Sequence, residues 1–392
     1  MVNLIVYQKR SGPIRGRHPW VFSGALKHIP ENLTSGELIT LSDEQGVFLA
    51  QGYFNSYSQI AVRLWSWDET EVIDQNFFNK RIREAYELRN KYLATKDTDS
   101  YRVVYGENDL LPGLVVDKYG EYLTVQFHTA GMERWKAEIV QALVEVIKPR
   151  GIYERSDLKI RQHSEEKSGV GVLFGEIPNR VEMRENGFTF LVDIAEGQKT
   201  GFFLDQRDKR YALQKYVAGK RVLNCFSYTG GFSVYALAAG ASRVVSVDAS
   251  ESAIALAREN MEANKLSGEK AEFVVGDVKK YLVTLKPYDF DVIILDPPAF
   301  VKDRHKVKEG LVGYRTINEA ALRLLPPGGI LVTASCSTHI SLQDFRFVLS
   351  EAAARAGRVV KIIETFTHGI DHPELVAFTE GDYLKCLFAI VQ

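Results

Sequence analysis

From about residue 188 onward, this sequence alternates short apolar runs with segments of helical spacing, and this pattern restricts the fold more than any other feature. The apolar runs are rich in β-branched residues and lie at 221–226, 243–248, 271–275, 290–295 and 329–333. The helical patterns between them lie at 231–239, 251–264 and 315–325. This alternation predicts a doubly wound α/β fold on a parallel sheet, whose ligands bind at the carboxyl ends of the strands. Functional residues are therefore expected directly after each strand.

The N-terminal part has a different pattern. Short strands are predicted at residues 3–7, 20–23, 37–41, 47–53 and 60–65, separated by Gly, Pro, Asn and Ser. They predict a small β-barrel over residues 1–70. A helix is then predicted at 74–92 and another at 132–147, with strands at 102–105, 114–117, 122–127 and 151–155. The expected organisation is a barrel (1–70), a mixed α+β middle domain (74–187) and an α/β domain (188–392), with a surface loop at 161–171.

The charges are balanced overall, with 49 Lys and Arg against 50 Asp and Glu, which excludes a uniformly basic nucleic-acid coat. The first thirty residues are a local exception, because they contain no acidic residue and five basic ones: Lys9, Arg10, Arg15, Arg17 and Lys27. This excess fits a strip that follows a phosphate backbone, and it fits a solvated strand edge equally well.

The cysteines and the hydropathy pattern exclude other classes. Cys225, Cys336 and Cys386 form no CxxC pair, so neither a disulfide framework nor a zinc site is expected, and no metal is predicted. No apolar run approaches the ~18 residues of a membrane span, and the first ten residues lack the pattern of a secretory signal. We therefore expect a cytoplasmic protein without a membrane partner.

The turn after the first α/β strand carries two adjacent glycines, which let backbone N–H groups approach a ligand closely. It reads Phe226-Ser227-Tyr228-Thr229-Gly230-Gly231. The second strand ends on Asp248, whose carboxylate can accept hydrogen bonds from ribose hydroxyls. The pattern predicts a nucleoside site, and it lacks the GxGxxG spacing of a dinucleotide site. Asp277, after the third strand, is placed to accept from an adenine amino group, to cap the next helix, or both.

The fourth strand leads into Asp296-Pro297-Pro298-Ala299-Phe300. Two prolines make this turn rigid, so the Asp296 carboxylate and the Phe300 ring can hydrogen-bond and stack on a planar base. A strand that simply ends at prolines is the alternative. The basic run that follows is expected either to clamp a phosphate backbone as a loop or to be solvated, and it comprises Lys302, Arg304, Lys306, Lys308 and Arg315.

The fifth strand leads into Ser335-Cys336-Ser337. A cysteine that leaves a central strand ahead of a helix starting near Ser341 is a candidate nucleophile, because a helix N-terminus lowers the pKa of a nearby thiol. Cys225 lies within the first strand. Cys386 lies in a late apolar run, 383–391, that looks like an edge strand. Both are expected in the core.

Together these motifs resemble the RlmI-type class I S-adenosylmethionine-dependent methyltransferases, which make 5-methylcytosine in bacterial 23S ribosomal RNA. The resemblance rests on residues 224–232 (NCFSYTGGF), Asp296-Pro297-Pro298 and Ser335-Cys336-Ser337, and it extends over nearly the whole chain. Residues 17–24 (RHPWVFSG) resemble the start of that family's RNA-binding PUA domain. Residues 199–207 (KTGFFLDQR) resemble its characteristic hairpin, which borders the cofactor.

The resemblance implies a Rossmann-like class I methyltransferase with S-adenosylmethionine as cofactor and 23S ribosomal RNA as partner, and it leaves a homodimer open. It implies a cofactor site formed by Phe203, Asp205, Gln206, Arg207, Phe226, Ser227, Tyr228, Thr229, Gly230, Asp248, Ala249, Asp277 and Val278. The implied chemistry is covalent, since Cys336 attacks carbon 6 of cytosine while Asp296 hydrogen-bonds the cytosine edge. The implied substrate contacts are Pro297, Pro298, Phe300, Lys302, Arg304, Arg17 and His18.

Two alternatives remain. Many RNA 5-methylcytosine enzymes carry a second cysteine where this chain has Pro297 and Pro298, and the turn resembles the Asp/Asn-Pro-Pro turn of amino-group methyltransferases. Methylation of the exocyclic amine of guanine, with Cys336 passive, is therefore the main alternative. The other is a non-catalytic RNA-binding ribosome-assembly factor that holds the cofactor without turnover. A nicotinamide oxidoreductase is disfavoured by the glycine spacing.

Overall fold

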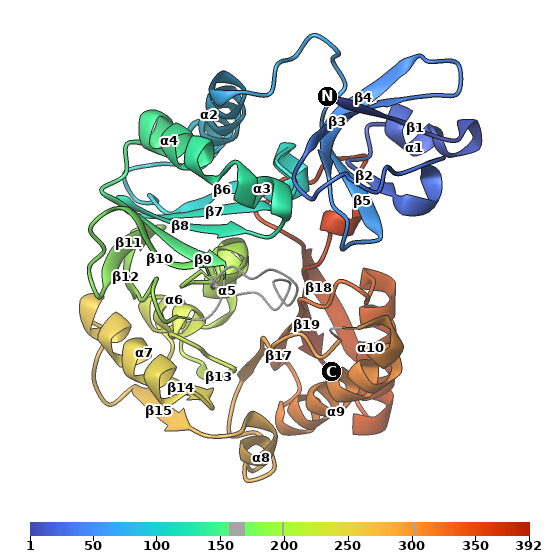
Figure 1. Cartoon of the computed structure of the whole chain (residues 1–392). Coiled ribbons are helices and arrows are strands. Elements are labelled where there is room, and N and C mark those ends of the chain that lie inside the picture. Colours follow the sequence, from blue (N-terminus) through green and yellow to red (C-terminus); the bar gives the residue numbers. More distant parts are fainter. Residues whose placement is uncertain (157–168, 198–199, 302) are drawn as a thin grey trace. The chain divides into compact units, whose positions relative to one another are not determined.

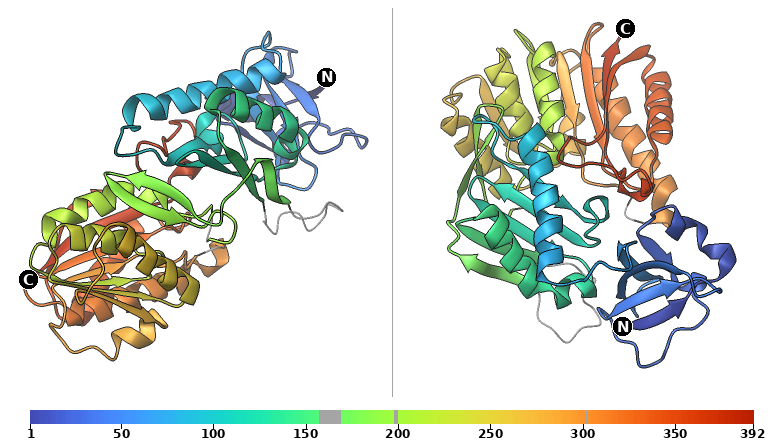
Figure 2. Two further views of the ribbon diagram at one scale, coloured as in Figure 1. Left: turned by 90° about the vertical axis from the view of Figure 1, so that its left-hand side faces the viewer. Right: turned by 90° about the horizontal axis from the view of Figure 1, so that it is seen from above.

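The computed structural model describes residues 1–156, 169–197, 200–301 and 303–392 (Figure 1, Figure 2). Most of the predicted surface loop (161–168), Lys199 and the predicted substrate contact Lys302 lie outside these residues. The described chain forms two compact units. The first comprises Met1–Val181, Asp193–Gly201 and Ile370–Gly381, and the second comprises Glu182–Val192, Phe202–Gly369 and Asp382–Gln392. The strands predicted before residue 156 thus belong to the first unit, and the α/β fold belongs to the second.

The N-terminal strands form a sheet whose two edges meet. Within the described residues its order is β1 (Val2–Ile5), β3 (Leu38–Ser42), β4 (Phe48–Phe54), β5 (Ile60–Ser66) and β2 (Trp20–Phe22). An isolated bridge between Val6 and Leu26 links the chain after β1 to the chain after β2. Short helical turns at Gln8–Arg10, Gly12–Arg15 (α1) and Ser23–Ala25 connect the strands. The predicted strands and the small barrel are confirmed.

The rest of the first unit is a mixed sheet with helices packed against it. The sheet order is β10 (Gly169–Gly175), β9 (Gly151–Ser156), β8 (Tyr122–Phe127), β7 (Leu114–Tyr119) and β6 (Tyr101–Tyr105). Helix α2 (Gln75–Tyr92) begins where the Asp74 side chain accepts a hydrogen bond from the backbone N–H of Phe77 at 3.0 Å.

Two predictions for this part are wrong. The helix predicted at 132–147 is interrupted at Trp135, which separates α3 (Ala130–Arg134) from α4 (Lys136–Ile147). Residues 169–171, predicted as loop, begin strand β10. The Gly-Val-Gly sequence misled the prediction, because glycine is usually depleted in strands.

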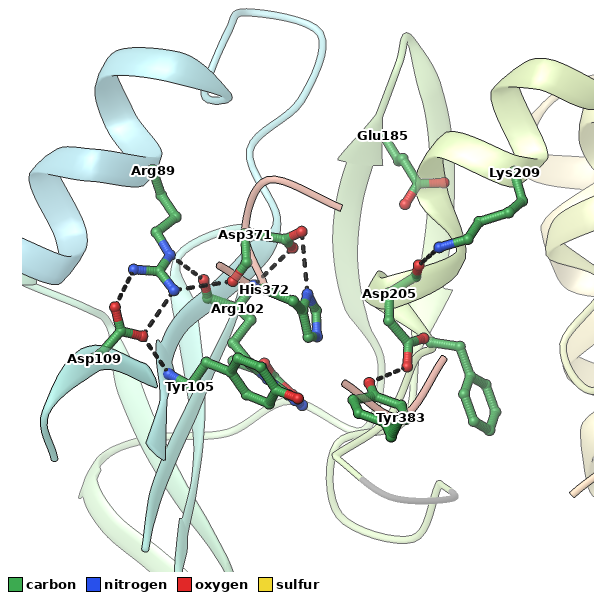
Figure 3. A network of polar contacts seen from close by, with 12 residues as sticks. Arg89, Arg102, Tyr105, Asp109, Glu185, Asp205, Lys209, Asp371, His372 and Tyr383 are labelled. Atoms are coloured by element: carbon green, nitrogen blue, oxygen red, sulfur yellow. Dashed lines mark hydrogen bonds and ion pairs between the residues drawn. The ribbon is translucent and has the colours of Figure 1, made fainter. Parts of the chain in front are cut away.

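A buried ion pair anchors a late segment of the chain in the first unit (Figure 3). Arg89 of α2 donates to both carboxylate oxygens of Asp109 at 2.7 and 2.8 Å and to the backbone carbonyl of Asp371 at 3.0 Å. The Asp371 carboxylate accepts from the backbone N–H of Arg102 at 3.1 Å. The Arg89 side chain is fully buried, so these partners offset the cost of burying its charge.

The described part of the second unit is built on a seven-stranded sheet. Its order is β15 (Ala271–Val275), β14 (Arg243–Asp248), β13 (Arg221–Cys225), β16 (Val292–Leu295), β17 (Ile330–Ser335), β19 (Lys385–Val391) and β18 (Val360–Phe366). The pairs from β15 to β17 are parallel, as predicted. Strand β19 is antiparallel to both of its neighbours, so the sheet is not wholly parallel. Because β19 is internal, the predicted edge position of Cys386 is wrong.

Helices cover both faces of this sheet, which confirms the doubly wound α/β class. Alternate strand residues such as Leu223 and Val245 share a core with α8 (Val278–Leu282), α9 (Val307–Leu324) and α10 (Leu342–Ala356). Their neighbours Val222 and Val244 face the opposite side, where α5 (Arg207–Leu213) and α6 (Gly231–Ala238) pack. The remaining helix labelled in Figure 1 is α7 (Glu251–Ala263). Across the described residues, no helix has the length and apolar character needed to cross a membrane.

Two further corrections concern segments near the strand ends. Helix α9 begins eight residues before the predicted start, so Lys308 lies in a helix rather than in a loop, and residues Arg304–Lys306 form a short 3-10 helix. The hairpin formed by β11 (Val181–Glu185) and β12 (Phe188–Val192) ends before the motif that was expected to be a hairpin. Residues Leu204–Gln206 of that motif form a 3-10 helix that leads into α5.

Candidate functional site

Four parallel strands of the second unit end at one edge of the sheet, and the predicted site residues come at or directly after these ends. They are Phe226 after β13, Asp248 at the end of β14, Asp296 after β16 and Cys336 after β17. The register aligns the strands, since Cys225 pairs with Val247 on one side and with Leu295 on the other. This edge is where ligands bind in doubly wound folds.

The turn after β13 is tight and left-handed at three positions. Phe226, Tyr228 and Gly230 have φ values of 58°, 46° and 79°. A Cβ atom on Gly230 would lie 3.0 Å from the Cβ of Ala257, so this position requires glycine for space as well as for conformation. Strain in non-glycine residues occurs preferentially at functional sites, where surrounding contacts maintain it.

Buried polar atoms line the same turn. The hydroxyl oxygens of Ser227 and Thr229 are buried and have no hydrogen-bond partner within the described part of the chain. Burying a hydroxyl without a partner is unfavourable, so such atoms indicate a polar ligand or ordered water. The turn therefore fits a ligand that carries hydrogen-bonding groups.

Asp248 supports this turn and retains capacity for a ligand. One carboxylate oxygen accepts from the backbone N–H of Tyr228 at 2.8 Å, and the other accepts from the backbone N–H of Ser250 at 2.9 Å. A carboxylate has about four acceptor sites, so two remain for hydroxyl donors. Asp248 is half-buried and accessible to such donors.

Asp277 and its neighbours are less tightly organised. The exposed Asp277 caps helix α8 by accepting from the backbone N–H of Lys280 at 2.9 Å, which is the structural role anticipated for it. Val278 is buried and Ala249 is exposed.

The segment before α5 reaches both the glycine turn and the Asp-Pro-Pro turn. The Phe203 ring contacts the Tyr228 ring edge to face, with centroids 5.2 Å apart. The Gln206 side-chain amide donates to the Asp296 carboxylate at 2.9 Å. Arg207 is buried at the start of α5. These contacts bring residues from distant parts of the sequence to one strand edge.

Asp205 belongs to a buried polar group (Figure 3). Its carboxylate accepts a hydrogen bond from the Tyr383 hydroxyl, and its backbone carbonyl accepts from the Lys209 ammonium. Burial lowers the pKa of Lys209, against the attraction of Asp205. These contacts hold the 3-10 helix that carries Asp205 and Gln206 in place.

Cys336 differs from the other cysteines in its exposure. It is partly exposed, whereas Cys225 and Cys386 are fully buried and burial raises the pKa of both thiols. The prediction that the last two are core residues is confirmed. The Cys336 sulfur lies 4.0 Å from the backbone carbonyl oxygen of Pro297, so the thiol adjoins the Asp-Pro-Pro turn.

The other predicted substrate contacts in the second unit differ in exposure. Pro297 is buried and Pro298 is exposed. The half-buried Phe300 ring lies 4.7 Å from the Tyr314 ring, and the Lys279 ammonium lies 5.2 Å from the Phe300 centroid. The exposed Arg304 lies in the short 3-10 helix before α9.

Arg17 and His18 belong to the first unit. The Arg17 guanidinium lies 5.4 Å from the centroid of the Trp67 ring, and the His18 ring nitrogen lies 3.4 Å from a carboxylate oxygen of Glu380. Arg17 thus contacts the barrel, and His18 contacts the segment 370–381 of the same unit.

Sequence reasoning missed Lys385, which is buried at the start of β19. A signal was present, because this lysine interrupts an otherwise apolar run at 383–391. It also missed the contact between Gln206 and Asp296, which joins positions 90 residues apart and leaves no trace in local spacing.

Comparison with known proteins agrees with this geometry. Residues 150–388 match the family described as S-adenosylmethionine-dependent methyltransferase, and residues 4–67 match the PUA-like domain family. The chain is 45% identical to Ribosomal RNA large subunit methyltransferase I of Shigella boydii serotype 4 and 44% identical to the protein of that name from Escherichia coli O139:H28. Each alignment spans 388 residues and covers 98% of both chains.

Solved structures give the same result over the full length. A chain from Streptococcus mutans described as a SAM-dependent methyltransferase superimposes with a TM-score of 0.84 at 25% identity. A second chain, described as a methyltransferase and complexed with SAH, gives a TM-score of 0.86 at 25% identity. Each comparison covers 100% of both chains.

The strand edge fits the adenosyl group of S-adenosylmethionine. It offers the buried hydroxyls of Ser227 and Thr229, the half-buried Asp248 carboxylate and a left-handed glycine turn. The cofactor of this protein is accordingly S-adenosylmethionine. The chain therefore belongs to the family of S-adenosylmethionine-dependent methyltransferases that includes ribosomal RNA large subunit methyltransferase I, with a PUA-like domain at its N-terminus.

Proposed function

We propose that this protein transfers a methyl group from S-adenosylmethionine to carbon 5 of a cytosine in 23S ribosomal RNA, through a transient covalent adduct at Cys336. The names of the curated relatives and the PUA-like domain support a large-subunit ribosomal RNA substrate. One observation carries the cytosine-5 chemistry. Of the three cysteines, all of which are among the described residues, Cys336 alone is partly exposed, and it adjoins the Asp-Pro-Pro turn.

The covalent step solves a chemical problem. Carbon 5 of cytosine is a poor nucleophile, and addition of the Cys336 thiolate to carbon 6 makes carbon 5 an enamine-like nucleophile. S-adenosylmethionine, when bound, supplies an electrophilic methyl group, and S-adenosylhomocysteine is the leaving group. Carbon 5 then carries both the methyl group and its original proton. Loss of that proton to a base restores the 5,6 double bond and expels the Cys336 thiolate.

We assign to Asp296 the role of holding the cytosine. Its carboxylate is oriented by the hydrogen bond from Gln206, and Pro297 and Pro298 restrict the backbone that follows it. A carboxylate accepts hydrogen bonds from an exocyclic amino group such as that of cytosine. In this proposal Asp296 fixes the plane of the base beside the Cys336 sulfur, while Pro297, Pro298 and Phe300 shape the slot, and Lys302 and Arg304 contact its RNA backbone.

The cofactor residues inferred from the sequence form the other part of the proposed site. Asp248 binds the ribose hydroxyls, and Asp277 and Val278 lie near the adenine. The glycine turn and residues 203–207 enclose the rest of the molecule. The grouping of these segments at one strand edge supports this assignment.

Asp248→Asn is expected to raise the dissociation constant of S-adenosylmethionine by about 10- to 100-fold, because hydrogen bonds to a charged carboxylate are lost. The amide keeps only one of the two oxygen acceptors that bind the backbone N–H groups of Tyr228 and Ser250, so the unfolding temperature of the variant is measured beside its affinity. Calorimetric titration measures the effect, and Glu262→Ala, an exposed acidic residue at the end of α7, is the matched control. Unchanged affinity in Asp248→Asn would remove Asp248 from the cofactor site.

We further propose that the barrel of residues 1–70 binds RNA, while the α/β domain of 188–392 carries the chemistry. Two of the five N-terminal basic residues are neutralised by neighbours, since Arg15 pairs with Asp43 at 2.6 Å and Lys27 pairs with Glu44 at 2.5 Å. The RNA contribution is therefore assigned to the exposed Lys9 and Arg10 and to Arg17 and His18.

The double substitution Lys9→Ala with Arg10→Ala is expected to weaken binding to 23S RNA and to reduce the slope of log affinity against log salt by about 1 to 2. S-adenosylmethionine affinity should not change. Filter binding over a salt series measures both quantities, with Lys265→Ala and Lys270→Ala as a charge-matched control. An unchanged slope would reject the barrel as the RNA surface.

Point substitutions are preferable to removal of 1–70, because Tyr53 and Trp65 share a core with Phe78 of α2.

The reaction itself is tested with labelled S-adenosylmethionine and deproteinised 23S RNA. The labelled RNA is digested to nucleosides, and mass spectrometry identifies the methylated one. We expect 5-methylcytidine. A methylated guanosine would replace the proposal with amino-group methylation, and the absence of transfer to both naked RNA and large subunits would favour an assembly factor.

A further inference from the structure

A lysine is buried next to the proposed nucleophile. Lys385 is 1% exposed and is the first residue of β19, where it pairs in register with Ser335 of β17. Its ammonium donates to the backbone carbonyl of Ser337 at 3.0 Å and to that of Tyr383 at 2.9 Å. Both acceptors are neutral, so neither hydrogen bond neutralises the charge. A buried ammonium is costly unless a negative charge lies near it.

Cys336, when its thiol is ionised, is one of the negative charges that act on Lys385. Burial lowers the pKa of Lys385, and the negative charges of Asp382, Cys336 and Asp344 act in the opposite direction. Asp382 lies just before β19, and Asp344 lies in the first turn of α10. Neither has a part in the proposed reaction, whereas Cys336 does. The attraction between two charges is mutual. The thiolate of Cys336 stabilises the charged ammonium of Lys385, and the ammonium must therefore stabilise the thiolate.

Two other groups near Cys336, helix α10 and Tyr314, contribute less to this effect. Helix α10 begins six residues after Cys336, and the capping box of Ser341 and Asp344 already occupies donors at its first turn. A helix dipole falls off within that turn, so helix α10 is a weak source of activation. Tyr314 of α9 donates to or accepts from the Ser337 hydroxyl at 3.0 Å, and burial raises the pKa of Tyr314, which keeps it neutral.

We propose that Lys385 is the positioning residue for Cys336. Its buried ammonium fixes the Ser337 carbonyl, and with it the turn that carries the sulfur, and it stabilises the thiolate form of Cys336. The inference rests on the proposed function in one respect, namely that Cys336 is the nucleophile. The proposal adds a group of the protein itself, the Lys385 ammonium, that stabilises the Cys336 thiolate before substrate and cofactor bind.

The test follows the rate of alkylation of Cys336 by iodoacetamide against pH, in protein without RNA. Cys225 and Cys386 are fully buried, so the reaction reports Cys336. In the unaltered protein we expect an inflection below ~8.5, the ordinary pKa of a cysteine thiol. An inflection at or above that value overturns the inference without any variant.

Three variants separate charge from packing. Lys385→Gln keeps a donor for the carbonyls and loses the charge, so the inflection should rise by about one unit, which is tenfold slower alkylation at neutral pH. Lys385→Arg keeps the charge and should stay close to the unaltered protein. Lys118→Gln is the matched control, because Lys118 is a lysine of the first unit that also donates to two backbone carbonyls, those of Asp99 and Gly120. Its substitution should leave the inflection unchanged.

The outcomes are distinct. Equal shifts in Lys385→Gln and Lys385→Arg, or no shift in Lys385→Gln with S-adenosylmethionine affinity retained, would reject Lys385 as the thiolate partner. The proposed reaction is tested separately, because a covalent adduct between Cys336 of the unaltered protein and RNA would support it in that case too. A shift in alkylation combined with methylation of guanosine would keep the Lys385 inference for the thiol and reject the proposed reaction.

Discussion

Replacement of Cys336 by alanine is expected to lower methyl transfer by a factor of about 10⁴ or more while S-adenosylmethionine affinity stays unchanged. The effect is large because carbon 5 of cytosine has no other route to nucleophilic character in this proposal. Cys336 directly follows β17, and its sulfur lies 4.0 Å from the Pro297 carbonyl oxygen. The proposed cofactor contacts come from the ends of other strands. Loss of one sulfur atom there leaves the glycine turn and Asp248 intact.

Transfer of a labelled methyl group to 23S RNA, together with calorimetric titration of S-adenosylmethionine, measures both parts of this prediction. Cys225→Ala is the matched control, since Cys225 is buried in strand β13 and should affect stability rather than turnover. Near-normal turnover in Cys336→Ala would show that the thiol is passive, as amino-group methylation of guanine requires.

The second large effect is expected for Asp296→Asn, which should lower kcat by about 10²- to 10³-fold. The Asp296 carboxylate accepts from the Gln206 amide at 2.9 Å and, in the proposal, from the cytosine amino group. An asparagine in its place keeps one oxygen acceptor and has an N–H₂ donor in the position of the other oxygen. That N–H₂ group faces either the Gln206 amide or the cytosine amino group, and both of these are donors. One of the two hydrogen bonds is then replaced by a clash of donors, and the base loses its orientation.

Asp291→Asn provides the control at the opposite end of the same strand. Asp291 precedes β16 and pairs with Arg221 at 3.0 Å, and this hydrogen bond holds the pKa of Asp291 below its usual value. Its replacement should reduce stability and leave kcat unchanged. Single-turnover measurements at saturating cofactor distinguish the two variants. Equal kcat values in Asp296→Asn and the unaltered protein would remove Asp296 from the reaction.

The features that could be predicted from the sequence are those encoded locally. Buried parallel strands have the pattern of short apolar runs, and their ends mark the ligand edge, so the sequence alone indicates Asp248, Asp296 and Cys336 as site residues. Cys225 and Cys386 were assigned to the core because both lie inside such runs. The barrel strands were recognised because turn residues separate them at short intervals.

The features that were missed depend on contacts between distant segments. The antiparallel insertion of β19 between β17 and β18 depends on pairing across the sheet, and an apolar run looks the same at an edge as in the interior. The short helix of residues Leu204–Gln206 is contacted by Tyr383, 178 residues away, whose hydroxyl donates to the Asp205 carboxylate. Lys385 shows the limit most clearly, because the sequence marks it as a lysine within an apolar run but does not identify its partner, the Ser337 carbonyl 48 residues away.

The central claim is that the sulfur of Cys336 forms a bond to carbon 6 of a cytosine during the reaction. A trap measures this directly: 23S RNA containing 5-fluorocytosine is incubated with the protein and S-adenosylmethionine. Fluorine at carbon 5 cannot leave as the proton does, so elimination is blocked and the adduct persists. We expect a denaturant-stable protein–RNA complex whose cross-linked peptide contains Cys336, and no complex with Cys336→Ser. Methylation of ordinary RNA without any such complex, or a cross-link at another residue, would contradict the account.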